Sequence, residues 1–137
     1  MTRPSLQVAA VTIAAPDPRE LAAFYARLLG WQVATSEGPR PGMPTTDGWA
    51  QMRPPAGTAA PTLNFEFEAD YQPPTWPSEP GKQQLMLHLD VAVDDLDAAV
   101  AHAVGAGATL AEFQPQQLVR VMLDPAGHPF CLFAPGG

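Results

Sequence analysis

Residues 11–33, VTIAAPDPRELAAFYARLLGWQV, share their plan with a second stretch beyond the middle of the chain, residues 87–110, LHLDVAVDDLDAAVAHAVGAGATL. Each stretch has an apolar segment, an aspartate turn, a segment with helical periodicity, a glycine and another apolar segment. A unit of this length that occurs only twice predicts two similar modules rather than a repeat array. Any binding or catalytic site is then expected where the modules meet.

The first copy contains a well-signalled helix. Asp17 is placed to cap it, Pro18 suits its first position, and Glu20 gives the spacing of a capping box. Gly30 is placed to end it. An apolar stripe follows the helical repeat and needs a sheet to cover: Leu21, Phe24, Tyr25, Leu28 and Leu29.

The second copy predicts a second helix on the same plan. Asp94 or Asp95 caps it, and Gly105 and Gly107 are placed to terminate it. Its expected apolar stripe consists of Leu96, Ala99, Val100, Ala103 and Val104.

The predicted strands alternate between apolar and polar positions. In residues 85–93, LMLHLDVAV, the odd positions are apolar and are expected to face a helix, whereas His88 and Asp90 share the other face. Residues 62–68, TLNFEFE, repeat this alternation, with Glu66 on the polar face. Further strands are predicted at residues 6–13, 31–36, 49–53, 109–113, 118–123 and 130–133. The element order is therefore βαβββ twice, an α+β fold.

The length and the proline distribution predict the domain organisation. A chain of 137 residues fits one domain and buries about two-thirds of its unfolded surface. Within it we expect a first module over residues 1–70, a proline-rich connection over residues 71–84 and a second module over residues 85–137.

Charge and composition exclude several partners. The formal charge of −7 repels nucleic acid and acidic lipid, and no apolar run approaches the length of a membrane span. The single cysteine, Cys131, rules out an intramolecular disulfide, and the N-terminus has no secretion signal, so we expect a cytoplasmic protein. Phosphate loops, CxxC pairs, HExxH and GxSxG motifs are absent from the sequence.

Three stretches of the chain resemble the vicinal oxygen chelate superfamily of glyoxalase, bleomycin-resistance and extradiol-dioxygenase proteins. They are residues 15–31, APDPRELAAFYARLLGW, residues 88–108, HLDVAVDDLDAAVAHAVGAGA, and residues 124–133, DPAGHPFCLF. The PPTWP stretch at residues 73–77 is similar to the glyoxalase-like subgroup. The resemblance implies two βαβββ modules whose curled mixed sheets form a cup, often in a homodimer.

The resemblance also implies where a metal would bind, because the metal enzymes of the superfamily place ligands on the first and last strands of each module. At these positions the chain has Glu66, His88 and Cys131, but Ala10 where the first histidine would stand. These three residues are the expected ligands if a divalent metal such as zinc, nickel, manganese or iron is bound. Because one ligand is missing, and Cys131 is flanked by apolar residues, we favour a site that holds neither a catalytic metal nor any other cofactor.

Glu66 and His88 are the candidate catalytic residues. Side by side on an enclosed face, they would form a coupled acid–base pair suited to proton abstraction next to a carbonyl. The alternative is structural: His88 donates a ring hydrogen to Asp90 or Glu66, and Cys131 is a small hydrophobic side chain.

Aromatic and charged side chains suggest a binding surface. Trp49 opens a predicted strand, and Tyr71 and Trp76 lie in the proline-stiffened connection. Aromatic rings give a large contact area for a planar ligand, so these residues, together with Asp90 and Arg120, are the candidate ligand-binding residues. The alternative for Arg120 is a solvated or ion-paired arginine.

The sequence therefore predicts a glyoxalase-like protein that binds a small organic molecule in the cup between its modules, in a sequestration or resistance role. The alternative is a lyase, isomerase or epimerase that uses Glu66 and His88, with or without a divalent metal.

Overall fold

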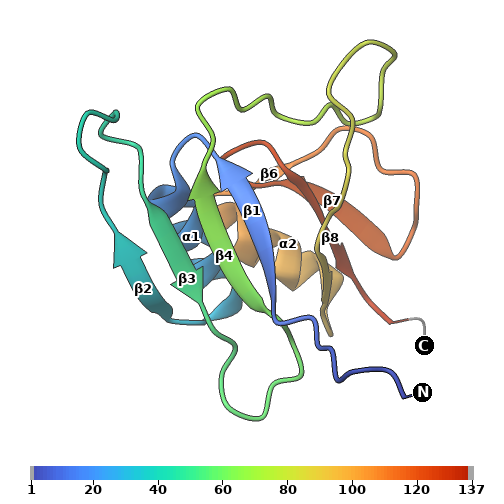
Figure 1. The fold of residues 1–137 in the computed structure, drawn as a ribbon. Coiled ribbons are helices and arrows are strands. Elements are labelled where there is room, and N and C mark those ends of the chain that lie inside the picture. Colours follow the sequence, from blue (N-terminus) through green and yellow to red (C-terminus); the bar gives the residue numbers. More distant parts are fainter. Residues whose placement is uncertain (1, 136–137) are drawn as a thin grey trace. The chain divides into compact units, whose positions relative to one another are not determined.

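A computed structural model describes residues 2–135, which fold into two compact units that divide between Ala69 and Asp70. Each unit contains one helix and a four-stranded mixed sheet, and the elements occur in the order βαβββ in both (Figure 1). The α+β class and the doubled element order predicted from the sequence are confirmed. Neither helix within residues 2–135 is long and apolar enough to cross a bilayer.

Unit 1 contains β1 (Ala10–Ala15), α1 (Pro18–Leu29), β2 (Val33–Glu37), β3 (Trp49–Met52) and β4 (Thr62–Phe67). The strands lie in the order β1-β4-β3-β2, with β1 parallel to β4 and the other neighbours antiparallel.

Unit 2 repeats this arrangement with β5 (Asp90–Ala92), α2 (Leu96–Ala106), β6 (Thr109–Leu110), β7 (Val119–Leu123) and β8 (Pro129–Phe133). The order is β5-β8-β7-β6, and again only the first and last strands of the unit are parallel. The topology of the two sheets is therefore the same, as the repeated sequence predicts.

Helix α1 begins and ends where the sequence predicts. The Asp17 carboxylate accepts a hydrogen bond from the backbone N–H of Glu20, and Gly30 ends the helix in the left-handed conformation, with φ of 71°. The apolar stripe packs on the sheet: the Tyr25 ring lies 4.8 Å from Phe24 and 5.7 Å from Phe65, centroid to centroid. All three rings are buried, and each contributes about 2–3 kcal/mol to folding.

Helix α2 differs from the prediction in two respects. Of the two predicted caps, Asp95 is the one that caps the helix, but Gly105, predicted as a terminator, lies inside the helix, which Gly107 ends. Val104, predicted in the apolar stripe, is 50% exposed, whereas Ala103 and Ala106 are buried. The reason is that small alanine side chains make the close contacts of this helix, so its buried face is narrower than the apolar pattern suggests.

Strand β5 is shorter than predicted, because Leu85 to Leu89 lie outside it and Leu87 is 81% exposed. The last ladder bond at this end runs from the Cys131 N–H to the Leu89 carbonyl. The next would need an N–H on residue 129, which is a proline, so the parallel pairing stops there. The predicted burial of Leu87 against the helix was wrong for this reason.

Strand β1 likewise begins at Ala10 rather than residue 6, and Leu6 and Val8 are about four-fifths exposed. The ladder closes with the bond from the Thr62 N–H to the Ala9 carbonyl, and the next donor, the Ala60 N–H, bonds to Thr58 instead. The pairing with β4 therefore ends at Ala9, and the described residues before it have no partner strand.

Gly48 joins the loop of residues 38–48 to β3 where no side chain fits. Its φ is 146°, and a Cβ there would lie 2.4 Å from the backbone oxygen of Glu37. Gly57 also has a positive φ, of 86°, but its Cβ would meet nothing within 4 Å.

We therefore predict that Gly48→Ala destabilises the protein by about 3 kcal/mol or more, whereas Gly57→Ala costs about 1 kcal/mol, because only the first adds a clash to the backbone strain. Urea unfolding of both variants measures the difference. An equal loss in the free energy of unfolding in the two variants would contradict the prediction, because it would mean that the contact with Glu37 adds nothing to the backbone strain.

Candidate functional site

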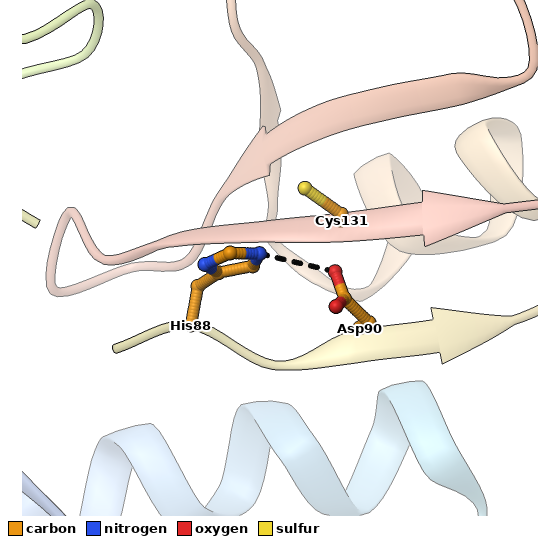
Figure 2. Close-up of side chains that lie close together, drawn as sticks. All are labelled: His88, Asp90 and Cys131. Atoms are coloured by element: carbon orange, nitrogen blue, oxygen red, sulfur yellow. Dashed lines mark ion pairs between the residues drawn. The ribbon is translucent and has the colours of Figure 1, made fainter. Parts of the chain in front are cut away.

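Three polar side chains of unit 2 form its candidate site: His88, Asp90 and Cys131. Figure 2 shows His88 and Asp90 extending from the β5 segment and Cys131 from the neighbouring β8. The His88 Nε2 atom lies 3.1 Å from a carboxylate oxygen of Asp90. One ligand atom from each residue, imidazole nitrogen, carboxylate oxygen and thiol sulfur, lies within 4.8 Å of the others.

Backbone register brings the three together. His88 and Asp90 are two residues apart along an extended segment and therefore project from the same face. Asp90 is the direct parallel partner of Cys131, and Cys131 is the antiparallel partner of Val121 in β7. Asp90 and Cys131 therefore lie in one row across the sheet, and His88 projects from the same face two residues before Asp90.

The electrostatics of the trio favour a protonated thiol. Burial raises the pKa of Cys131, and the Asp90 carboxylate raises it further by its charge and by accepting a hydrogen bond. The expected partnership between His88 and Asp90 is present, as the short ion-pair distance shows. The trio is thus a connected polar group in which Asp90 serves both neighbours.

A small cavity of about 130 Å³ opens beside the trio. Its wall is largely apolar, and its polar lining residues are His88, Gln116 and Cys131. The lining residues are Trp76, Leu85, His88, Pro115, Gln116, Val119, Val121, Pro129 and Cys131. An apolar cavity of about 150 Å³ holds one benzene ring, so this space suits a single ring or a group of similar size.

Trp76 forms a fixed wall of the cavity. Its indole N–H donates to the Phe113 carbonyl oxygen at 3.0 Å, and the two rings lie 6.0 Å apart, centroid to centroid. The peptide bond between Trp76 and Pro77 is cis. Because the only polar atom of the indole is already paired, the ring offers its apolar surface to the cavity.

The equivalent positions of unit 1 carry different chemistry. Aligning the helix caps Asp17 and Asp95 gives an offset of 78 residues between the modules. Ala10 is then the sequence counterpart of His88, and Thr12 is the counterpart of Asp90. Thr12 pairs with Asn64, as Asp90 pairs with Cys131. The structural counterpart of Cys131 is therefore Asn64, and Glu66 lies two residues further along its strand.

Glu66 and Trp49 come together in unit 1. They are direct antiparallel partners on β4 and β3, and both line a cavity of about 480 Å³. His88 belongs to unit 2, so the acid–base pair of Glu66 with His88 stays a prediction. Asp90 is the carboxylate that contacts His88 within unit 2.

Tyr71 and Arg120 do not line the cavity beside Trp76. The Tyr71 ring packs on His128, 5.2 Å between centroids, and burial raises its pKa above the ordinary value, with the Asp124 charge adding to the effect. Arg120 pairs with Leu132, on the sheet face opposite Cys131, and donates to the carbonyl oxygens of Gln116, Gln117 and Val119.

Sequence patterns missed two buried carboxylates. The Asp124 side chain accepts hydrogen bonds from the backbone N–H groups of Ala126 and His128, and the residue is 4% exposed. Asp47 is fully buried and binds the Arg40 guanidinium through both oxygens, at 2.8 and 3.0 Å. The only sequence signal for Asp47 is its place in a loop rich in glycine and proline.

The trio fits a divalent metal such as zinc. Nitrogen, oxygen and sulfur donors are present, and three protein ligands leave a fourth position open, as in catalytic zinc sites. Asp90 takes the place in this set that the sequence assigned to Glu66. Binding would need the thiol of Cys131 to lose its proton.

The fold and the site define a protein of two βαβββ units with a small cavity in unit 2. The family model of the glyoxalase-like domain matches residues 10–133, and the chain belongs to this family. This confirms the resemblance to the vicinal oxygen chelate superfamily. No curated protein gives a significant match.

Solved structures share the fold at low sequence identity. A glyoxalase/bleomycin resistance protein/dioxygenase family enzyme from Burkholderia phytofirmans PsJN is 19% identical, with a TM-score of 0.62 over 94% of this chain and 98% of that one. The antibiotic binding protein TnmS3 from Streptomyces sp. CB03234 is 20% identical, with a TM-score of 0.59 over 98% and 100%. A glyoxalase family protein from Enterococcus faecalis is 19% identical, with a TM-score of 0.63 over 93% and 96%.

We predict that Asp90→Asn speeds alkylation of Cys131 by iodoacetamide at neutral pH, because loss of the carboxylate lowers the thiol pKa and raises the thiolate fraction. Mass spectrometry measures the rate on the single cysteine. Asp94→Asn, which removes the same charge outside the trio, should leave the rate unchanged; equal rates in all three proteins would contradict the assignment.

The ion pair between Arg40 and Asp47 predicts a dependence of stability on pH. Hydrogen bonds from Arg40 lower the pKa of Asp47 to about 2, from an ordinary value of 3.8. The stabilisation is therefore present above pH 4 and lost as the pH falls through about 2.

Asp47→Asn should accordingly weaken the protein at neutral pH and lose less stability on acidification than the wild type. Arg40→Lys keeps the positive charge but cannot bind both carboxylate oxygens through a planar guanidinium. Its stability at neutral pH should lie between those of the wild type and Asp47→Asn. Urea unfolding at pH 7, 4 and 2.5 measures this. Parallel pH curves for wild type and Asp47→Asn would refute it.

Proposed function

We propose that the protein binds a small organic molecule in the cavity beside Trp76 and that binding needs no catalytic metal. The observation that carries this proposal is the combination of an apolar space for one ring, an indole wall with its N–H already paired, and a few polar lining residues, His88, Gln116 and Cys131. A small number of polar groups in an apolar pocket orients a ligand without reacting with it.

The state of the trio supports binding over catalysis. Asp90 contacts His88 and accepts from the Cys131 thiol, so its two neighbours are satisfied and the thiol stays protonated. TnmS3, an antibiotic binding protein, gives a precedent for a binding role on this fold. A sequestration or resistance role, in a cytoplasmic homodimer, is the setting that we propose.

The second candidate is a lyase, isomerase or epimerase, and the contact between His88 and Asp90 favours it. A carboxylate that contacts an imidazole can orient it for proton transfer, here with Glu66 as the proposed second group. His88, Asp90 and Cys131 would hold a divalent metal, which when bound would supply Lewis-acid polarisation of a carbonyl.

We predict that benzyl alcohol, used as a one-ring probe, shifts the NMR signals of the Trp76 indole N–H and of the Val119 and Val121 amides. Val119→Phe, which fills the cavity, should abolish the shifts, whereas Val104→Phe, the same change at an exposed position, should preserve them.

The titration is repeated with a chelator. Unchanged affinity supports metal-independent binding. Shifts that disappear in chelator indicate the metal-dependent alternative, and chemical conversion of the probe or its aldehyde would favour an enzyme. Absence of shifts at these three residues would refute the cavity as the binding site.

A further inference from the structure

A row of three side chains crosses the sheet of unit 1, and none of the three lines the cavity of unit 2. Glu37 of β2 is the direct partner of Trp49 in β3, and Trp49 is the direct partner of Glu66 in β4. Direct antiparallel partners project from the same face, with Cβ atoms about 5 Å apart. An indole therefore stands between two carboxylates.

This row lies on the face that α1 leaves open. Ala50, Met52, Leu63 and Phe65 alternate with it and are buried on the other face, where α1 packs. The row borders a cavity of about 480 Å³, within the range of sites for small ligands. Its lining residues are Glu37, Gly38, Arg40, Gly48, Trp49, Glu66 and Phe67.

The charge of this cavity is negative. No side chain among residues 2–135 forms an ion pair or hydrogen bond with the carboxylates of Glu37 or Glu66. Arg40 is the one basic residue in the lining, and its guanidinium is bound through two nitrogens to Asp47. That pair is neutral as a whole, and the Arg19 guanidinium, whose side chain lies near Gly48, donates to the carbonyl oxygens of Thr45 and Asp47 outside the lining. The two carboxylates that flank the indole therefore have no ion-pair partner within the part of the chain that the structure describes.

We infer that this row is a recognition site for an organic cation, specifically a protonated amine that carries an aromatic or aliphatic group. The indole attracts the cation through its ring and gives apolar contact to the attached group, while the carboxylates pair with the ammonium. A bare metal ion fits poorly, because the carboxylates stand two strands apart, with backbones separated by about 10 Å. The site does not rest on the function proposed for unit 2.

The test compares three probes that share a phenyl ring: phenethylammonium, the neutral phenethyl alcohol and the anionic phenylacetate. Binding is followed at pH 7 and low salt by NMR, at the Trp49 indole N–H and the amides of Gly48 and Phe67. Only phenethylammonium is expected to shift these signals, and added salt should weaken its binding.

Variants then assign the interaction. Glu37→Gln and Glu66→Gln should each weaken binding about 2- to 5-fold, and Trp49→Leu should weaken it by a similar factor at the two amides. Glu112→Gln, which removes an exposed charge in unit 2, should have no effect. Because both glutamates are exposed, the substitutions leave the core intact, as an unchanged amide spectrum would verify.

Equal binding of the alcohol, preference for phenylacetate, or unchanged affinity in both glutamine variants would each overturn the inference. These outcomes are separate from those for benzyl alcohol, which are read at Trp76, Val119 and Val121. One site can therefore fail while the other stands.

Discussion

Parallel pairing between the first and last strands of each βαβββ unit is the constraint on which both sheets, and the trio of unit 2, depend. A parallel pair cannot be closed by a tight turn, so a long connection must join its strands, and here that connection contains the helix and two further strands. In unit 2 this pairing sets Asp90 beside Cys131, and in unit 1 it sets Ala14 beside Glu66. Residues far apart in sequence thus share a face because the register of one ladder requires it.

Pairing also explains where the sequence was a good guide and where it was not. Caps, glycine stops and apolar stripes are local signals, and they predicted α1 and the element order correctly. The length of β5 depends on whether its partner can donate, and Pro129 lies some forty residues away in the chain. The alternating pattern of residues 85–89 could not reveal that loss.

The sites were predicted less completely than the fold, for a related physical reason. The sequence marked His88 and Cys131 by their residue types, and Trp49 and Glu66 by their strands. It gave no reason to join Asp90 to Cys131 or Glu37 to Trp49, because these are ladder partners on separate strands. The buried Asp47 also escaped notice, since its partner Arg40 lies in the same irregular loop and no periodic pattern marks either residue.

The repeated frame has thus kept its topology while its polar chemistry has diverged. One unit carries imidazole, carboxylate and thiol at a row where the other carries alanine, threonine and asparagine. In the first unit the acidic groups lie further along the sheet, beside Trp49. Two sheets of the same topology can in this way present different ligand chemistry.

The loop of residues 38–48 is fastened near both ends. Arg40 is tied to Asp47, the Arg19 guanidinium donates to the carbonyl oxygens of Thr45 and Asp47, and Gly48 lies against Glu37. Between these points, residues 41–44 are exposed. Length and composition can vary there while the flanking strand ends stay in register, which makes this short stretch the natural place for relatives to diversify and for an engineer to insert a label.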